Sequence, residues 1–320
     1  MNRRQFMKTG VAATTLLDTF PAKLTSLARE QPPDGLEKRS LGKTGEKLSI
    51  LGFGGIVVKD ATPEEASLRV QEALEHGVNY FDVAPSYGNA EERLGPALQP
   101  FRHKVFLACK TEHRRKGEAA AELDRSLQKL RTDHVDLYQL HAVTTAEEVE
   151  TILGPDGALR AFVEARQAGK IRFLGFSAHS VEAALALMEG FAFDTILFPV
   201  NYVTWHAGNF GPQVLARAHE RGMGILALKA MAKGPWPSGA THTSPKCWYE
   251  PCSHPEEALR ALRFTLSHPV TAAIPPGDEK LYRMALELGG RITPLDAPEM
   301  EAIKQKALAG EPIFRYPRKA

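Results

Sequence analysis

Short apolar runs recur along the chain from residue 50 onward, and amphipathic segments separate them. The runs read "LSILGFGG", "VNYFDVA", "KVFLACK", "HVDLYQLH", "IRFLGFS", "DTILFPVN", "GILALKA" and "VTAAIP". They are rich in Val, Ile, Leu and Phe and lack polar alternation, which is typical of strands buried on both faces. The pattern therefore predicts a sheet of eight parallel strands.

The segments between these runs have helical periodicity. "TPEEASLRVQEALEHG" offers Thr62 as N-cap, Pro63 at the first helical position and Gly77 at the end. "GEAAAELDRSLQKLR" and "PEEALRALRFTLSH" repeat the same spacing of apolar residues. Each predicted strand is thus followed by a helix or a helical stretch.

Predicted strand ends are spaced like βα units. They fall at Asp82, Lys110, His141, Ser177, Asn201, Lys229 and Ile274. One unit needs about 30 residues, so eight units over roughly 250 residues fit a closed barrel. An open doubly wound sheet would carry a G-x-G-x-x-G turn after its first strand, and "GFGGIVV" does not fit. The expected fold is therefore an α/β protein, a (β/α)₈ TIM barrel.

Two segments lie outside the eight units. "EKRSLGKTGEKLS" places a Gly-Lys-Thr-Gly turn between two extended runs, which predicts an N-terminal β-hairpin that plugs the N-terminal end of the barrel. The end of the chain begins as a helix and finishes in an irregular basic segment. We therefore expect a barrel domain over residues 36–312 and a C-terminal tail over residues 313–320.

The N-terminus has the features of an export signal. Arg3 and Arg4 are followed by Phe6, Lys8, a short apolar run and the small residues of "SLA". This order predicts that residues 1–30 are a twin-arginine signal, which would engage the twin-arginine export machinery and deliver the protein to the periplasm. The apolar run is too short to span a bilayer, so no stable membrane insertion is expected. A disordered basic N-terminus on a cytoplasmic protein is the alternative.

Composition narrows the possible partners. The 320 residues are 43% hydrophobic and 24% charged, with a formal net charge of +2, which is typical of a soluble globular protein and not of a nucleic-acid binder. Cys247 and Cys252, in "CWYEPC", could form a loop disulfide in an oxidising compartment. They are one cysteine pair short of the usual zinc pattern, so no metal site is expected.

Four polar residues at or just beyond three consecutive strand ends suggest proton transfer. They are Asp82, Tyr87, Lys110 and His141. Active sites of such barrels are built at the C-terminal ends of the strands. Tyrosine has a pKa near 10, and a neighbouring ammonium group lowers it. Lys110 can be that cation, Asp82 can hold it, Tyr87 can donate the proton and His141 can orient a carbonyl oxygen.

These motifs resemble the aldo/keto reductase superfamily. The similar stretches are "GVNYFDVAPSYGNAEERLG", "ACK", "VDLYQLH" and "GKIRFLGFS", and the likeness covers about residues 36–290. It implies a (β/α)₈ barrel that reduces a small-molecule aldehyde or ketone with NADP(H). It also implies that Asp82, Tyr87, Lys110 and His141 are the catalytic residues, with Tyr87 as general acid.

At the positions that would contact the nicotinamide, the sequence departs from the family pattern. Ser177 matches the family's Ser-Asn pair, but Ala178 replaces the asparagine and His179 follows. Asn201 stands where a glutamine is common, and Lys229 where an aromatic ring usually stacks under the nicotinamide. The remaining implied cofactor contacts are Gly54, Gly55, Pro276, Gly277, Lys280 and Arg283.

Within that list, "IPPGDEKLYR" resembles the family's phosphate loop. Lys280 and Arg283 could neutralise an adenosine 2′-phosphate with the help of the helix-start amides. Ordinary surface charges on a helix are the alternative interpretation of the two residues.

Two other functions remain as alternatives. The altered nicotinamide loops are compatible with a nicotinamide-nucleotide-binding sensor or accessory subunit with vestigial catalysis. A metal-dependent barrel hydrolase would need a His-x-His pair at the first strand, where this chain has "GFGG". The intact set of four polar residues favours the reductase.

Overall fold

The computed structural model describes residues 35–317. The predicted signal therefore lies outside the described residues, as do the last three residues of the predicted tail. Eight strands form one parallel sheet, in the order β12-β9-β8-β7-β6-β5-β4-β3. Their bounds are β3 (Phe53–Gly54), β4 (Tyr80–Asp82), β5 (Phe106–Thr111), β6 (Val135–Val143), β7 (Ile171–Ala178), β8 (Thr195–Pro199), β9 (Gly224–Leu228) and β12 (Ala272–Ile274).

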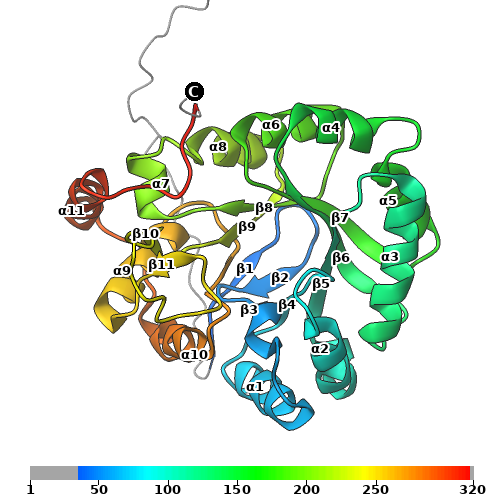
Figure 1. The fold of residues 1–320 in the computed structure, drawn as a ribbon, viewed down its shortest axis with the longest axis horizontal. Helices are drawn as coiled ribbons and strands as arrows, with labels where there is room; N and C mark the ends of the chain where they lie inside the picture. The colour runs from blue at the N-terminus through cyan, green and yellow to red at the C-terminus, as the bar shows by residue number, and fades with distance from the viewer. Residues whose placement is uncertain (1–34, 318–320) are drawn as a thin grey trace, which may run out of the picture. The chain divides into compact units, whose positions relative to one another are not determined.

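The sheet closes on itself between its first and last strands. Leu51 and Ala273 form a parallel bridge, Gly52 N donates to Ala273 O at 3.0 Å, and Ala273 N donates to Ile50 O at 2.8 Å. Figure 1 shows the strands at the centre with helices around them. The predicted (β/α)₈ TIM barrel is confirmed, with all eight strands at the predicted apolar runs.

Helices surround the barrel because each connection places its apolar stripe against the sheet. Their bounds are α1 (Pro63–Glu75), α2 (Ala90–Leu98), α3 (Lys116–Lys129), α4 (Ala146–Leu153), α5 (Ala158–Gln167), α6 (Val181–Gly190), α7 (Tyr202–His206), α8 (Pro212–Glu220), α9 (Pro255–Leu266), α10 (Glu279–Leu288) and α11 (Ala297–Leu308). Thr62 caps α1 in a capping box with Glu65, and Gly77 follows the helix with φ +86°. The sequence signals for this helix are thus confirmed at both ends.

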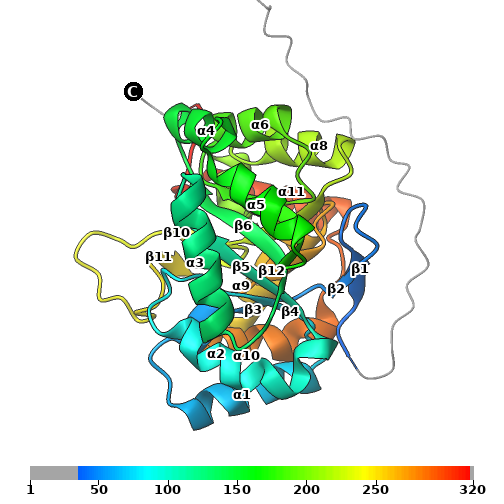
Figure 2. The same ribbon diagram turned by 90° about the vertical axis from the view of Figure 1, so that its right-hand side faces the viewer.

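The predicted hairpin precedes the barrel. β1 (Lys38–Ser40) and β2 (Lys47–Ser49) pair antiparallel. Leu41 and Leu48 are fully buried in one apolar cluster with barrel side chains such as Tyr80 and Phe106, so the hairpin closes one end of the barrel interior. Figure 2 shows the hairpin and the β10–β11 loop at opposite ends of the barrel.

The connection after β9 is longer than the others and contains strands β10 (Ala232–Pro235) and β11 (Tyr249–Pro251). Cys247 and Cys252, which flank β11, are both free and buried, so the loop disulfide considered from the sequence is absent. Burial raises the pKa of the Cys247 thiol to about 12 and that of Cys252 to about 11, which keeps both thiols protonated.

Candidate functional site

Neighbouring strands deliver polar side chains to the barrel interior. Asp82 ends β4 and Lys110 lies in β5. Two residues earlier on the same strands, Tyr80 and Ala108 belong to the inner apolar cluster. Side chains at i and i+2 of a strand share a face, so this alternation turns Asp82 and Lys110 inward as well.

The polar residues are not level in the strand ladder. Asp82 pairs with Ala108, whereas Lys110 pairs with Gln139 of β6, so His141 lies two positions further along its own strand. Asp82, Lys110 and His141 therefore occupy successive levels of the ladder, each two positions beyond the last. The length of the lysine side chain spans the difference, and Lys110 Nζ contacts Asp82 Oδ1.

Lys110 and Asp82 form a buried ion pair. Their side chains are 0% and 3% exposed, and Lys110 Nζ also lies 3.3 Å from both Val83 O and the Tyr87 hydroxyl. Burial by itself would lower the pKa of Lys110, but Asp82 and Tyr87 outweigh it, so that this pKa lies above its usual range. Lys110 therefore stays charged inside the barrel.

Sequence reasoning missed two residues that hold Asp82. The Tyr80 hydroxyl donates to Asp82 Oδ2 at 3.1 Å, and Gln139 Nε2 donates to the same oxygen at 3.0 Å. A signal for both was present, because Tyr80 precedes Asp82 by two residues and Gln139 precedes His141 by two. Both carboxylate oxygens of Asp82 are thus bound, which fixes the carboxylate that holds Lys110.

Tyr87 is brought to Lys110 by a tight turn after β4. Tyr87 N donates to Ala84 O at 3.0 Å, and Gly88 continues the turn with φ +64°. Burial raises the pKa of Tyr87, Lys110 lowers it and Asp82 raises it, with a net pKa above the usual range. Lys110 lowers the pKa of Tyr87, as predicted. The expectation that this pKa is lowered overall is wrong, because burial raises it by more than Lys110 lowers it. Tyr87 accordingly keeps its proton at neutral pH.

His141 lies beside Tyr87 with a neutral ring. The two rings meet edge to face at 5.7 Å between centroids. His141 Nδ1 lies 3.3 Å from Ser86 Oγ and 3.4 Å from Glu112 Oε1. Burial, followed by the charge of Lys110, lowers the pKa of His141 to about 2. The structure thus brings all four predicted catalytic residues to one end of three adjacent strands.

At the ends of β7 and β8, two predicted cofactor residues carry buried hydrogen-bonding groups. Ser177 Oγ accepts from Ala142 N at 2.7 Å, which leaves its own hydroxyl proton available. Asn201 is 1% exposed and caps α7 by accepting from Thr204 N at 2.9 Å. Its amide nitrogen has no hydrogen-bond partner among residues 35–317. A buried donor of this kind suits a ligand oxygen such as that of a carboxamide.

Packing accounts for the three glycines that were predicted as cofactor contacts. A Cβ on Gly54 would lie 2.9 Å from Ile274, one on Gly55 would lie 2.7 Å from Val83, and one on Gly277 would lie 2.4 Å from Ile56. Each position therefore excludes a side chain through its neighbours. Pro276, which precedes Gly277, is buried.

The predicted phosphate contacts on α10 already have partners in part. Arg283 binds Glu72 at 2.9 Å and Glu279 at 2.9 Å. Asp278 caps the helix, with Oδ1 accepting from Lys280 N at 3.1 Å. Two of the helix-start amides, those of Lys280 and Leu281, therefore already have Asp278 as a partner. The Lys280 side chain is exposed.

Lys229 and His179 form a second cluster at the same end of the barrel. Lys229 directly follows β9, and its Nζ lies 3.2 Å from His179 Nε2. Burial lowers the pKa of Lys229 to about 7 and, with the charge of Lys229, lowers the pKa of His179 to about 3. This pairing was not predicted from the sequence, because the two residues are far apart along the chain.

The loop between β10 and β11 is fastened across the barrel end. Lys246 Nζ donates to three backbone carbonyls around the 3₁₀ turn after β3: Ile56 O at 3.1 Å, Val57 O at 3.3 Å and Lys59 O at 2.8 Å. β12 lies between β9 and β3 in the closed barrel. The loop therefore passes over the end of β12, where Pro276 and Gly277 begin the turn into α10.

Within residues 35–317, the structure holds no cluster of three or more His, Cys, Asp or Glu side chains suited to a metal ion. Over the same residues, no helix is both long and apolar enough to span a membrane.

Comparisons with known proteins find similar sequences and folds. The model of the "Aldo/keto reductase family" matches residues 50–271. The "Uncharacterized oxidoreductase YqkF" of Bacillus subtilis is 33% identical over 156 residues, which are 44% of this chain and 49% of that protein. The "L-galactose dehydrogenase" of Arabidopsis thaliana is 27% identical over 215 residues, 62% of this chain and 66% of that protein. The matches thus span about half to two thirds of these relatives.

Solved structures support the fold. The holo form of the aldo-keto reductase AKR11C1 from Bacillus halodurans superposes with a TM-score of 0.69 at 23% identity, over 88% of this chain and 99% of that one. At this level of identity the likeness concerns the barrel architecture alone.

Proposed function

The chain belongs to the aldo/keto reductase family, and on this premise we propose that it is an NADP(H)-dependent oxidoreductase that reduces an aldehyde or ketone to an alcohol. The observation that carries the proposal is the buried Lys110 ammonium, which contacts the Asp82 carboxylate and lies 3.3 Å from the Tyr87 hydroxyl. This contact joins a proton donor to a fixed positive charge, as protonation of a developing alkoxide requires.

The protein acts at the carbonyl oxygen of the substrate. His141 Nδ1 lies 3.3 Å from the Ser86 hydroxyl, and in the tautomer that carries the ring proton on Nε2, this nitrogen donates to the carbonyl oxygen and orients it. Tyr87 transfers its phenolic proton to the same oxygen as negative charge develops there. Lys110 stabilises the resulting tyrosinate, and Asp82 keeps Lys110 protonated. When bound, the reduced nicotinamide supplies the hydride.

Residues at the strand ends would hold the nicotinamide. The unpartnered amide nitrogen of Asn201 and the free hydroxyl proton of Ser177 fit the carboxamide group of such a ring. Gly54, Gly55 and Lys229 line the same end of the barrel on β3 and after β9. The Asn201 amide and the Ser177 hydroxyl fit a nicotinamide nucleotide, whereas Lys229 does not supply the aromatic ring that the resemblance implies at its position.

We assign the adenosine phosphate to Pro276, Gly277, Lys280 and Arg283. A 2′-phosphate has to compete with Glu72 and Glu279 for Arg283, because these carboxylates already bind the guanidinium group. Each tenfold difference in affinity corresponds to about 1.4 kcal/mol, the scale of one charge-assisted hydrogen bond. We therefore expect NADPH to bind about tenfold tighter than NADH, and Lys280→Ala to remove most of that difference in a fluorescence titration.

A nucleotide titration followed by a panel of aldehydes and ketones tests the proposal. The reductase predicts that NADPH binds and that at least one panel member oxidises it at a steady rate. Tight NADPH binding without turnover on any member would instead support the alternative, a nicotinamide-nucleotide-binding sensor or accessory subunit. The altered loops at Ala178 and Lys229 favour that alternative, whereas the complete catalytic set weighs against it.

We further propose that residues 1–30 direct the protein through the twin-arginine machinery to the periplasm. That machinery exports folded proteins, so the nucleotide could travel already bound. Fractionation of cells that express the full chain and an Arg3→Lys, Arg4→Lys variant tests the proposal. The full chain is expected in the periplasm and the variant in the cytoplasm; equal distribution of both would overturn it.

A further inference from the structure

Lys229 is a buried basic residue without a counter-ion in the part of the chain that the structure describes. It is 9% exposed, and burial is the one cause acting on its pKa. None of the carboxylates in residues 35–317 compensates its charge. An isolated buried ammonium group is unfavourable, so a site that retains one is suited to a ligand that brings the missing negative charge.

The surroundings of Lys229 are rings rather than acids. Its Nζ lies 3.2 Å from His179 Nε2, 5.5 Å from the Trp248 ring centroid and 5.6 Å from that of Phe314. His179 in turn stacks on Phe314 at 5.3 Å. These rings stabilise a cation in part, but none supplies a negative charge.

The backbone holds Lys229 in a strained conformation. Its φ is +64°, in the left-handed region that non-glycine residues seldom adopt. Ala142, which follows His141, has φ +52° at the same end of the barrel. Strained residues of this kind concentrate at binding and catalytic sites, where the surrounding structure imposes a fixed side-chain direction.

The cluster lies beside the proposed carbonyl site. His179, Arg114 and Lys229 each lie close enough to His141 to lower its pKa further. Glu112 is the carboxylate nearest to His141, and its side chain is 60% exposed. The charges of Arg114 and Lys229 therefore act on His141 together with that of Lys110.

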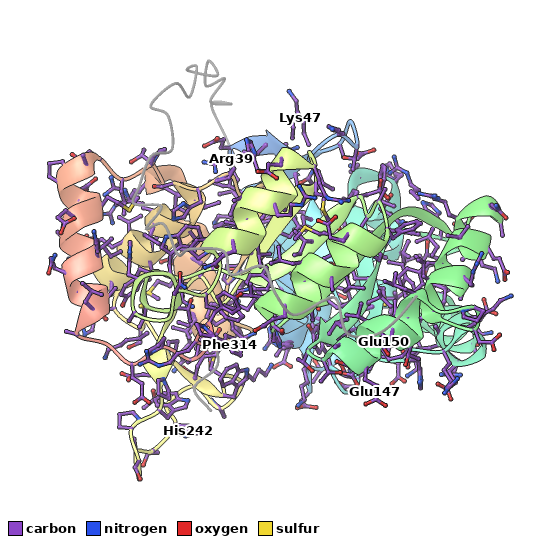
Figure 3. All side chains as sticks on the ribbon, turned by 90° about the horizontal axis from the view of Figure 1, so that it is seen from above. Arg39, Lys47, Glu147, Glu150, His242 and Phe314 are labelled. Carbon is purple, nitrogen blue, oxygen red and sulfur yellow. The ribbon has the colours of Figure 1, made fainter. Side chains whose placement is uncertain are left out.

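Phe314 and the β10–β11 loop complete the wall of the cluster. Figure 3 places Phe314 on the same side of the molecule as His242 of that loop, opposite Arg39 and Lys47 of the hairpin. The Trp248 side chain is 57% exposed, so the cluster reaches solvent along this ring.

We propose that Lys229, assisted by His179, binds a carboxylate group of the substrate, so that the enzyme prefers aldehydic or keto acids over neutral carbonyl compounds. This inference rests on the proposed function, because it names the substrate class of that site. A phosphate of the cofactor has similar chemistry, but the predicted phosphate residues lie on the turn into α10 and not beside His141.

Matched substrate pairs test the preference. Each of 2-, 3- and 4-carboxybenzaldehyde is compared with its own methyl ester, and succinic semialdehyde with its methyl ester. In the wild type, kcat/KM for the preferred acid is expected to be at least ten times that for its own methyl ester. Lys229→Met should lower that ratio at least tenfold, whereas Lys233→Met, on an exposed lysine four residues away, should leave it unchanged. An equal ratio in wild type and Lys229→Met would overturn the proposal.

A binding measurement separates this inference from the proposed function. Benzoate and succinate are titrated against the full chain while tryptophan fluorescence is recorded, since Trp248 lies in the cluster. Binding that weakens at least tenfold in Lys229→Met supports the anion site even when no carbonyl compound is turned over. The anion site would be overturned if the wild type bound neither anion, or if Lys229→Met weakened the binding of NADPH but not that of the anions. In either case, turnover of neutral aldehydes would still support the proposed reductase function.

Discussion

Replacement of Lys229 by methionine should stabilise the protein, since methionine keeps a flexible chain of similar length without the buried charge. Burial lowers the pKa of this lysine from 10.5 to about 7. At 1.36 kcal/mol per pKa unit, this shift corresponds to a cost of about 5 kcal/mol for keeping the buried lysine charged. The full cost applies at a pH where the lysine is protonated in both the folded and the unfolded state. The true gain is smaller if the folded chain relaxes, so we expect at least about 2 kcal/mol at pH 6.

The stability difference between Lys229→Met and the wild type should depend on pH. Below pH 7 both states carry the ammonium group, so the full penalty applies to the wild type. Between pH 7 and 10.5 the folded protein releases the proton while the unfolded chain keeps it, and the wild type gains stability as the pH rises. The advantage of Lys229→Met should therefore shrink from pH 6 to pH 9.5.

Urea unfolding of both proteins at pH 6, 7.5 and 9.5 measures the effect, with midpoints converted to free energies of unfolding. Lys233→Met is the matched control, because Lys233 is exposed and pairs with Glu250 at 2.7 Å. Its substitution should change stability by less than about 1 kcal/mol and in the opposite direction. If Lys229→Met were less stable than the wild type at pH 6, or its advantage did not change with pH, the reasoning about an uncompensated charge would be wrong.

Three further predictions follow from the site. Asp82→Asn should lower the free energy of unfolding by about 3 kcal/mol, because Lys110 loses its buried charged partner; urea unfolding measures it, and a loss below about 1 kcal/mol would contradict the ion-pair assignment. Lys246→Met should speed NADPH release about tenfold or more in stopped-flow displacement, because it removes three hydrogen bonds that fasten the loop over the turn into α10, to which we assign the adenosine phosphate; an unchanged rate would contradict a role of this loop in holding the nucleotide. His141 should stay neutral down to pH 4 in histidine-labelled NMR spectra. Because the unfolded chain takes up this proton near pH 6.5, His141 should make folding less favourable as the pH falls below that value. A His141 ring that titrates near pH 6.5 in the folded protein would refute its burial.

The barrel itself was predictable because its signals are local. Apolar runs without polar alternation marked all eight strands, and Thr62, Pro63 and Gly77 marked the ends of α1. The inward direction of Asp82 and Lys110 also follows from strand alternation. These features depend on neighbours within a few residues, which the sequence displays directly.

The rest of the site depends on contacts between distant segments. The net pKa of Tyr87 follows from its burial, which the sequence does not state, and the local effect of Lys110 alone predicted the wrong direction. Lys246 reaches the turn after β3 from a loop nearly two hundred residues later in the chain. Lys229, His179 and Phe314 likewise meet only because the barrel closes.

The phosphate loop illustrates a further limit of motif matching. Lys280 and Arg283 have the right charge and spacing, yet Arg283 is already bound by Glu72 from α1. Asp278, a residue within the matched motif, occupies the helix-start amides. A motif gives the residue types at a site, while their availability to a ligand depends on which partners the fold supplies.

Single-turnover reduction of an aldehyde by Tyr87→Phe, loaded beforehand with NADPH, tests the central claim most directly. The account predicts that the variant binds NADPH as tightly as the wild type but oxidises it about 10² to 10⁴ times more slowly, since the general acid is missing. An unchanged rate of NADPH oxidation would contradict the assignment of Tyr87 as the proton donor supported by Lys110 and Asp82.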